Sequence, residues 1–207
     1  MKLSKILTPV FLLPAFFLLI SCGKNYSPEE KKYIEDVEKI RNENNDYMKN
    51  DPNSPFNAKS KVHFEPLKYY EPDPEFKFQS KLYEFDKKDT VIIFGTKGEE
   101  RKAVRYGYVK LNYKNDDFKV NVYEGTSRSG EKYFSIWFTD KTTGEENYGV
   151  GRYIDFELNT DKEFLYTIDF NLAYNPYCAY SSDYSCAIPT KEDYIDLAIE
   201  AGEKNFH

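Results

Sequence analysis

The alternation of apolar and polar residues along the chain predicts a β-rich domain. From residue 62 onward hydrophobic positions recur at every second residue, most clearly in residues 76–85 and 104–113. This period of two is typical of strands with one buried face. Clusters of Gly, Asn, Asp and Lys that favour turns separate the segments. The predicted strands are residues 62–70, 76–85, 90–94, 103–113, 118–123, 133–139, 151–156 and 164–170.

These short strands follow one another without intervening helical segments. We therefore predict a mainly β fold, an antiparallel sandwich or a partly open barrel, formed by a single domain over residues 54–207. Near the end of the chain, the spacing of Tyr194, Leu197 and Ala198 predicts a short C-terminal helix within residues 191–203.

A helix is predicted to precede the β-rich domain, over residues 28–51. Ser27 can cap it, Pro28 suits its first turn, and Glu30 completes a capping box. Apolar residues then recur at three- and four-residue spacings, which indicates a helix with one narrow apolar face. We expect this helix to lie across the domain or to lead into it.

The first 21 residues have the features of a secretory signal. Two lysines precede an apolar run over residues 6–20, which two prolines interrupt, so the run is too short for a membrane-spanning helix. It ends in Leu-Ile-Ser before Cys22, which resembles the lipobox of bacterial lipoproteins. Residues 1–21 are therefore predicted to be a lipoprotein signal peptide, with an ordinary signal peptide as the alternative.

A lipidated Cys22 would attach the protein to a membrane of the bacterial cell envelope through a tether over residues 22–27. The residue after Cys22 is not an aspartate, which favours the outer over the inner membrane. The net charge of −6 becomes −8 when the two leader lysines are removed. Because such an acidic chain repels phosphate backbones, we do not expect a nucleic-acid partner.

The two remaining cysteines, Cys178 and Cys186, are predicted to form a disulfide, because an exported chain meets an oxidising compartment. A metal site is the competing interpretation, but His63 and His207 are the only histidines, and zinc takes four such ligands. Two free thiols are the third alternative. We assign no metal, and the sequence identifies no cofactor.

Several motifs, most of them in the second half of the chain, resemble those of the bacterial family called domain of unknown function 1684. They are Ser54-Pro55-Phe56 and the segments 138–144, 148–153, 169–180, 186–189 and 201–204. The resemblance covers nearly all of the chain after the leader. It implies a single domain whose signature-rich half is residues 138–204, and it implies no activity, substrate or cofactor.

The segment from Asp169 to Cys186 lacks helical or strand periodicity after Phe170, and it is rich in amides and tyrosines. Long ordered loops of this kind are often functional. Together with neighbouring polar residues it supplies the predicted ligand-binding set. That set is Asp140, Arg152, Tyr153, Asp169, Asn171, Tyr174, Asn175 and Glu203.

Arg152 could bind a carboxylate or phosphate with its planar guanidinium. Alternatively it forms a salt bridge with Asp140, Asp155 or Asp169 that holds loops together.

Two functions remain open at this point. The first is a lipid-anchored envelope protein that binds a small polar molecule, a glycan or a partner, or has a structural role. The second is a hydrolase that uses Asp140, Asp169 or Glu203, with Arg152 holding an anionic substrate.

Overall fold

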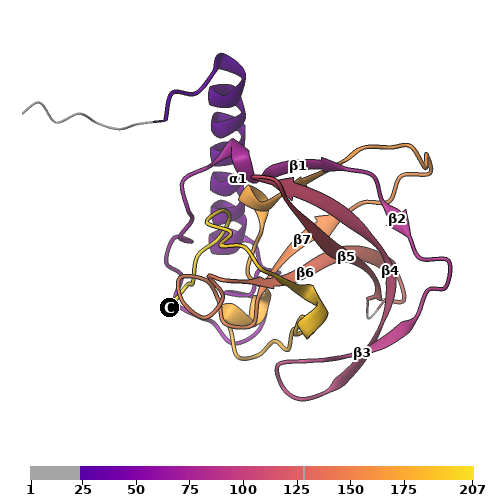
Figure 1. Ribbon diagram of the computed structural model, residues 1–207. Helices are drawn as coiled ribbons and strands as arrows, with labels where there is room; N and C mark the ends of the chain where they lie inside the picture. The colour runs from indigo at the N-terminus through magenta and orange to yellow at the C-terminus, as the bar shows by residue number, and fades with distance from the viewer. Residues whose placement is uncertain (1–23, 128) are drawn as a thin grey trace, which may run out of the picture.

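The computed structural model describes residues 24–127 and 129–207, which form antiparallel β-structure and one long helix (Figure 1). Helix α1 spans Pro28–Asn50. The strands are β1 (Lys77–Ser80), β2 (Tyr83–Glu84), β3 (Thr90–Phe94), β4 (Glu100–Tyr113), β5 (Asp116–Thr126), β6 (Lys132–Asp140), β7 (Arg152–Phe156), β8 (Tyr166–Asp169) and β9 (Tyr194–Ile195). The mainly β prediction is confirmed. The described strands do not close into a barrel.

Seven strands form the larger sheet, in the order β2-β4-β5-β6-β7, with β3 also paired to β4 and β9 paired in parallel to β6. Strands β1 and β8 form a separate antiparallel pair. The main hydrophobic core contains side chains from β4 to β8 and from the chain end, such as Val109, Ile136, Phe138, Ile168 and Ile199. This core lies on one face of the larger sheet. A third, smaller apolar cluster packs on the other face and contains Ile93, Ala103, Tyr123, Trp137 and Ala187.

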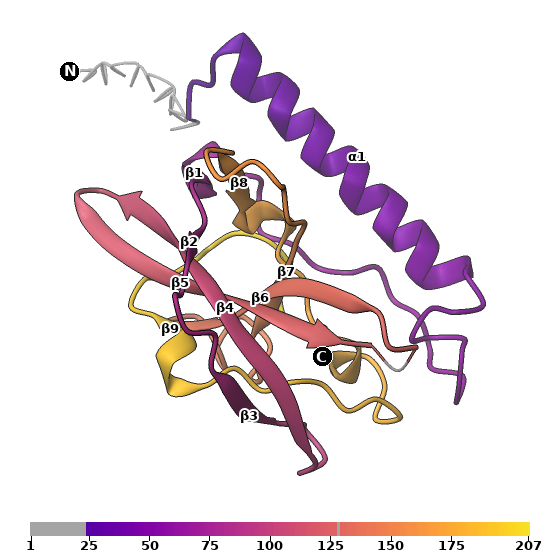
Figure 2. The same ribbon diagram turned by 90° about the vertical axis from the view of Figure 1, so that its right-hand side faces the viewer.

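Helix α1 runs along one side of the β-structure, as Figure 2 shows. The predicted capping box is formed: Glu30 N–H donates to Ser27 Oγ at 3.2 Å, and Ser27 N–H donates to Glu30 Oε2 at 2.7 Å. Val37, Arg41 and Met48 are its buried residues. Of these, Met48 packs into a second apolar cluster. This cluster also contains Tyr180, from the loop over residues 169–186, and Phe206, near the end of the chain.

The predicted C-terminal helix is wrong. The segment contains only one 3₁₀ turn, η4 (Lys191–Asp193), followed by β9 and an irregular chain. Burial alternates along it instead, with Ile195, Ile199 and Ala201 inside. The carbonyl groups of Ile199 and Ala201 accept hydrogen bonds from the Arg152 guanidinium. These tertiary bonds replace the bonds that a helix would have made.

The predicted strand over residues 62–70 is also wrong. This segment is extended and its side chains alternate in burial, but only Tyr69 forms a bridge, with Glu203. The Leu67 N–H donates to Asn45 Oδ1 of α1 at 2.8 Å. The apolar side chains of residues 62–70 therefore join the second cluster beside α1. The alternation in this segment reflects burial in that cluster and not pairing in a sheet. None of the helices within residues 24–207 is long and apolar enough to cross a membrane.

Candidate functional site

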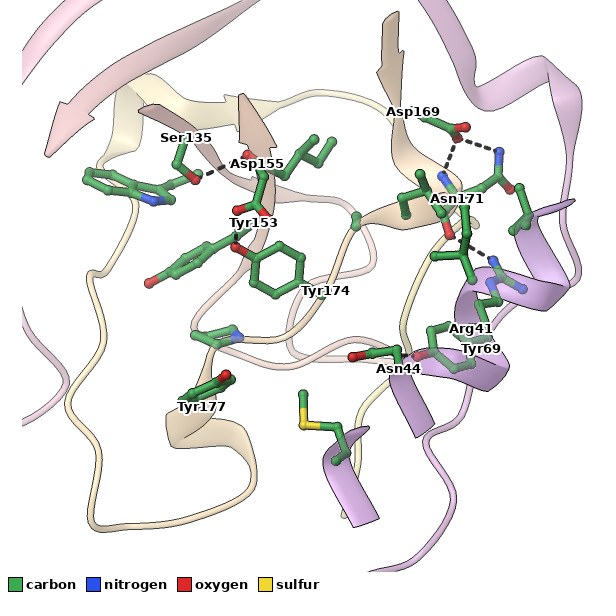
Figure 3. Close-up of a pocket in the computed structure, with 18 of the residues that line it drawn as sticks. Arg41, Asn44, Tyr69, Ser135, Tyr153, Asp155, Asp169, Asn171, Tyr174 and Tyr177 are labelled. Carbon is green, nitrogen blue, oxygen red and sulfur yellow. Dashed lines mark hydrogen bonds between the residues drawn. The ribbon is translucent and has the colours of Figure 1, made fainter. Parts of the chain in front are cut away.

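A groove with a volume of about 1040 Å³ lies between α1 and the face of β6 and β7 that is turned away from the main core. Figure 3 shows the two walls: Tyr153, Asp155 and Tyr174 lie on one side of the cavity, and Arg41 and Asn44 of α1 lie on the other. The volume is at the upper end of the range for small-molecule sites. This groove is the candidate functional site.

The β-sheet wall follows from the alternation of two neighbouring strands. Tyr133, Ser135 and Trp137 of β6 all line the groove, and so do Tyr153 and Asp155 of β7. The register places Trp137 opposite Tyr153 and Ser135 opposite Asp155. Because side chains two residues apart in a strand point to the same face of the sheet, β6 and β7 together place aromatic and polar side chains along one side of the groove.

A glycine makes room for the exposed aromatic residue of this wall. Gly125 of β5 pairs with Tyr133, and a Cβ atom at residue 125 would overlap the Tyr133 ring. The ring therefore lies directly against the backbone of β5 while Tyr133 remains 44% exposed. A glycine opposite an aromatic residue permits such a close approach.

The loop after β8 completes the aromatic wall. Tyr174 and Tyr153 exchange backbone hydrogen bonds, at 2.9 and 3.0 Å. The Tyr174 hydroxyl donates to Asp155 Oδ1 at 2.6 Å, and the Tyr153 hydroxyl donates to the carbonyl of Ala187. Burial raises the pKa of Tyr174, and the nearby Asp155 carboxylate raises it further. Burial also raises the pKa of Tyr153, so both phenols are neutral donors at physiological pH.

Asp169 and Asn171 hold α1 in place, which positions the opposite wall. The Tyr33 hydroxyl donates to both carboxylate oxygens of Asp169, at 2.8 and 2.7 Å. Arg41 donates to the carbonyl groups of Tyr70 and Asn171, at 2.7 and 3.0 Å. Although Asp169 and Asn171 line the groove, they are buried, and much of their hydrogen-bonding capacity is used by α1.

Arg152 and Asp140 form a buried ion pair away from the groove. Arg152 Nη2 lies 2.7 Å from Asp140 Oδ2, and the two side chains are 1% and 0% exposed. Arg152 follows Gly151, whose φ of +107° is unusual for other residues, and where a Cβ would come within 2.6 Å of the Phe138 carbonyl. The salt-bridge alternative for Arg152 is confirmed, with Asp140 as the partner.

Glu203 and Asn175 form a second buried set. The Glu203 carboxylate accepts hydrogen bonds from the Asn175 backbone at 3.0 Å and from the Tyr180 hydroxyl. The Asn175 amide donates to the Lys204 carbonyl at 2.8 Å. Burial raises the pKa of Glu203 from its ordinary 4.5 to about 7. These contacts join the loop to the chain end, and neither residue lines the groove.

The predicted disulfide is absent: Cys178 and Cys186 are free. They are neighbours, because the Cys178 N–H donates to Cys186 Sγ at 3.2 Å. The loop is held by other contacts, such as the hydrogen bond from Thr96 N–H to the Cys186 carbonyl at 3.0 Å. Within the described part of the chain no three His, Cys, Asp or Glu residues are grouped so that they could hold a metal ion. The predicted lipidation site, Cys22, lies outside the described residues.

The structure thus separates the predicted ligand-binding set. Tyr153, Asp169, Asn171 and Tyr174 line the groove, whereas Asp140, Arg152, Asn175 and Glu203 are buried elsewhere. Sequence reasoning missed the wall residues of β6 and did not select Asp155 as a ligand contact. The signal that could have found them was the alternation around Trp137, the only tryptophan of the chain.

Comparison with known proteins agrees with the resemblance noted above. The family described as "Protein of unknown function (DUF1684)" matches residues 62–204. No curated protein matches the chain. Among solved structures, the chain is similar to the solution NMR structure of an uncharacterized protein from Haloarcula marismortui, with 23% sequence identity and a TM-score of 0.62. The match covers 85% of this chain and 96% of that one, and at this identity it shows the fold alone.

Proposed function

Because the chain belongs to the DUF1684 family of proteins of unknown function, its role has to be inferred from its own site, and we propose that it binds a small organic molecule or a glycan in the groove beside α1. One observation carries this proposal: a cavity of about 1040 Å³ is lined by aromatic rings together with an exposed carboxylate. Concave sites of mainly apolar lining with few polar groups are the usual form of ligand sites.

The aromatic residues support binding because their rings are available. Tyr133 is 44% exposed, and Tyr153, Tyr174 and Tyr177 are partly exposed. On the α1 side Ile40 is 46% exposed although it lines the groove. Apolar surface left open in a concave site gains free energy when a ligand covers it.

The hydrolase alternative has less support from the geometry. Asp140 and Glu203, two of its three acids, are 3% and 0% exposed and do not line the groove. Asp169 does line it, but its carboxylate accepts the Tyr33 hydroxyl and the Asn171 N–H. A general acid or base has to reach the reacting atoms, which the two interior carboxylates do not.

For the location of the protein, the proposal rests on the sequence. A lipid on Cys22, at the end of an apolar leader, would attach the protein to a membrane of the bacterial envelope, with the outer membrane favoured. Lipidation is tested by the mass of the mature protein extracted from membranes. Replacement of Cys22 by Ser should move the protein from the membrane fraction to the soluble fraction, and unchanged membrane association would refute the anchor.

Ligand binding is tested through Trp137, the only tryptophan of the chain, which lines the groove. A library of small molecules and oligosaccharides is titrated against the full-length protein, and tryptophan fluorescence is followed. A true groove ligand should change this signal, and Tyr153→Ala should weaken its binding. Tyr83→Ala, at a 38% exposed position outside the groove, serves as the control. If no compound binds, or if Tyr83→Ala has the same effect, the proposal fails.

A further inference from the structure

The aromatic rings of the groove meet at angles and do not form a flat platform. The ring centroids of Trp137 and Tyr153 are 6.0 Å apart with planes inclined by 48°, and those of Tyr153 and Tyr174 are 6.0 Å apart with planes inclined by 75°. A sugar ring stacks best on one exposed plane. Inclined aromatic faces favour a compact cation that touches several of them at once, as in aromatic cages for alkylated ammonium groups.

An acid that forms no ion pair within residues 24–127 and 129–207 lies beside these rings. Asp155 is exposed, lines the groove, and accepts the Tyr174 hydroxyl on Oδ1 at 2.6 Å. Its other oxygen, Oδ2, accepts no hydrogen bond, and the carboxylate forms no ion pair, with any residue in the described part of the chain. Figure 3 shows this carboxylate beside Tyr153 and Tyr174, on the wall that faces α1. Among the described residues, the Asp155 carboxylate is thus left without a cationic partner.

Three cationic residues line the groove: Arg41, Lys77 and Arg101. The Arg41 guanidinium is buried and donates to two backbone carbonyl groups. Arg101 Nε donates to Glu99 Oε1 at 3.0 Å, and its Nη2 donates to the Ser185 carbonyl at 2.6 Å. Lys77, which also lines the groove, places its ammonium group 4.3 Å from the Tyr33 ring centroid, beside α1. The chain as a whole carries a net charge of −6, which attracts cations from solution.

From these observations we infer that the groove binds a ligand with an alkylated ammonium head group, which contacts the partly exposed rings of Tyr153 and Tyr174 and pairs with Asp155. The inference rests on the proposed ligand-binding function and names its ligand class. The same chemistry is offered by a free cation such as choline and by the head group of a phosphocholine lipid. A carboxylate and an aromatic face act together on such a cation, since both attract positive charge.

The test compares choline with its neutral isostere, in which a tert-butyl group replaces the trimethylammonium group. Both are titrated into the full-length protein in a non-ionic polyoxyethylene detergent, with tryptophan fluorescence and calorimetry as readouts. Choline should bind at least about tenfold more tightly than the isostere, because only choline is attracted by the rings and the carboxylate. Equal binding of the two compounds would overturn the inference, and this comparison needs no variant.

Two substitutions then test whether the carboxylate of Asp155 causes the preference for choline. Asp155→Asn keeps the shape and an acceptor for Tyr174, and it should remove most of the preference for choline. Asp117→Asn, which changes the net charge equally at an exposed position outside the groove, should leave the preference intact. A preference that survives Asp155→Asn would overturn the role of this carboxylate.

The remaining comparisons distinguish a free cation from a lipid head group as the ligand. They also distinguish failure of this inference from failure of the proposed ligand-binding function. Tighter binding of glycerophosphocholine than of choline would support a lipid head group, and the reverse order would support a free cation. If neutral ligands bind in the groove and choline does not, the cation inference fails while the proposed binding function stands. If neither class of compound binds, both fail.

Discussion

Replacement of Arg152 by Met should destabilise the protein strongly, because it leaves a buried charge without its partner. The Asp140 side chain is fully buried, and of the described residues only Thr142 would still donate hydrogen bonds to its carboxylate. The carbonyl groups of Ile199 and Ala201 would lose the guanidinium that they bond. Breaking a buried pair costs about 3–5 kcal/mol, and each unsatisfied buried carbonyl costs roughly 1–3 kcal/mol.

We therefore expect Arg152→Met to lower the free energy of unfolding by about 4 kcal/mol or more, a large share of the roughly 5–15 kcal/mol of a typical domain. The assay is urea unfolding, followed by the fluorescence of Trp137, which is 4% exposed. Arg105→Met is the matched control. Arg105 pairs with Glu192, whose side chain is 64% exposed, so this loss should stay below about 1 kcal/mol. A loss for Arg152→Met within about 1 kcal/mol of the Arg105→Met loss would refute the account of this buried pair.

Three further outcomes are expected. The pKa of Glu203 is raised from 4.5 to about 7 by burial, so its contribution to stability is full below pH 4.5 and is lost as the pH rises through 7. The total loss is roughly 3 kcal/mol, and Glu203→Gln should flatten this slope in urea unfolding at a series of pH values. Asn171→Ala removes the side chain that bonds the Tyr33 hydroxyl and the Asp73 backbone, so hydrogen exchange in α1 should accelerate more than in β5; equal change in both would contradict this role. Free Cys178, which is partly exposed, should react with a thiol reagent before buried Cys186; a native protein in which neither cysteine reacts until a reductant is added would contradict the free thiols.

The local pattern of the sequence was sufficient for much of the fold. The capping box of Ser27 and Glu30 forms as predicted, and the segment predicted as residues 90–94 is strand β3. Both features depend on residues that are close together in the chain. A capping box uses residues three apart, and a strand with one buried face has a period of two. The predictions over residues 62–70 and 191–203 were wrong, because distant partners decided the backbone hydrogen bonds there.

The candidate site needed the tertiary structure. The sequence singled out polar residues of the signature-rich half, but in the structure these are used inside the protein. Arg152 connects β7 to the chain end, and Glu203 connects the chain end to the loop. The groove instead uses the alternate face of β6 and β7, and its second wall is α1, more than 80 residues earlier in the chain. Sequence alone determined which residues are apolar, charged or turn-forming. Only the tertiary structure decided which polar groups are buried with a partner and which, like Asp155, stay exposed, because burial and pairing depend on contacts between distant segments.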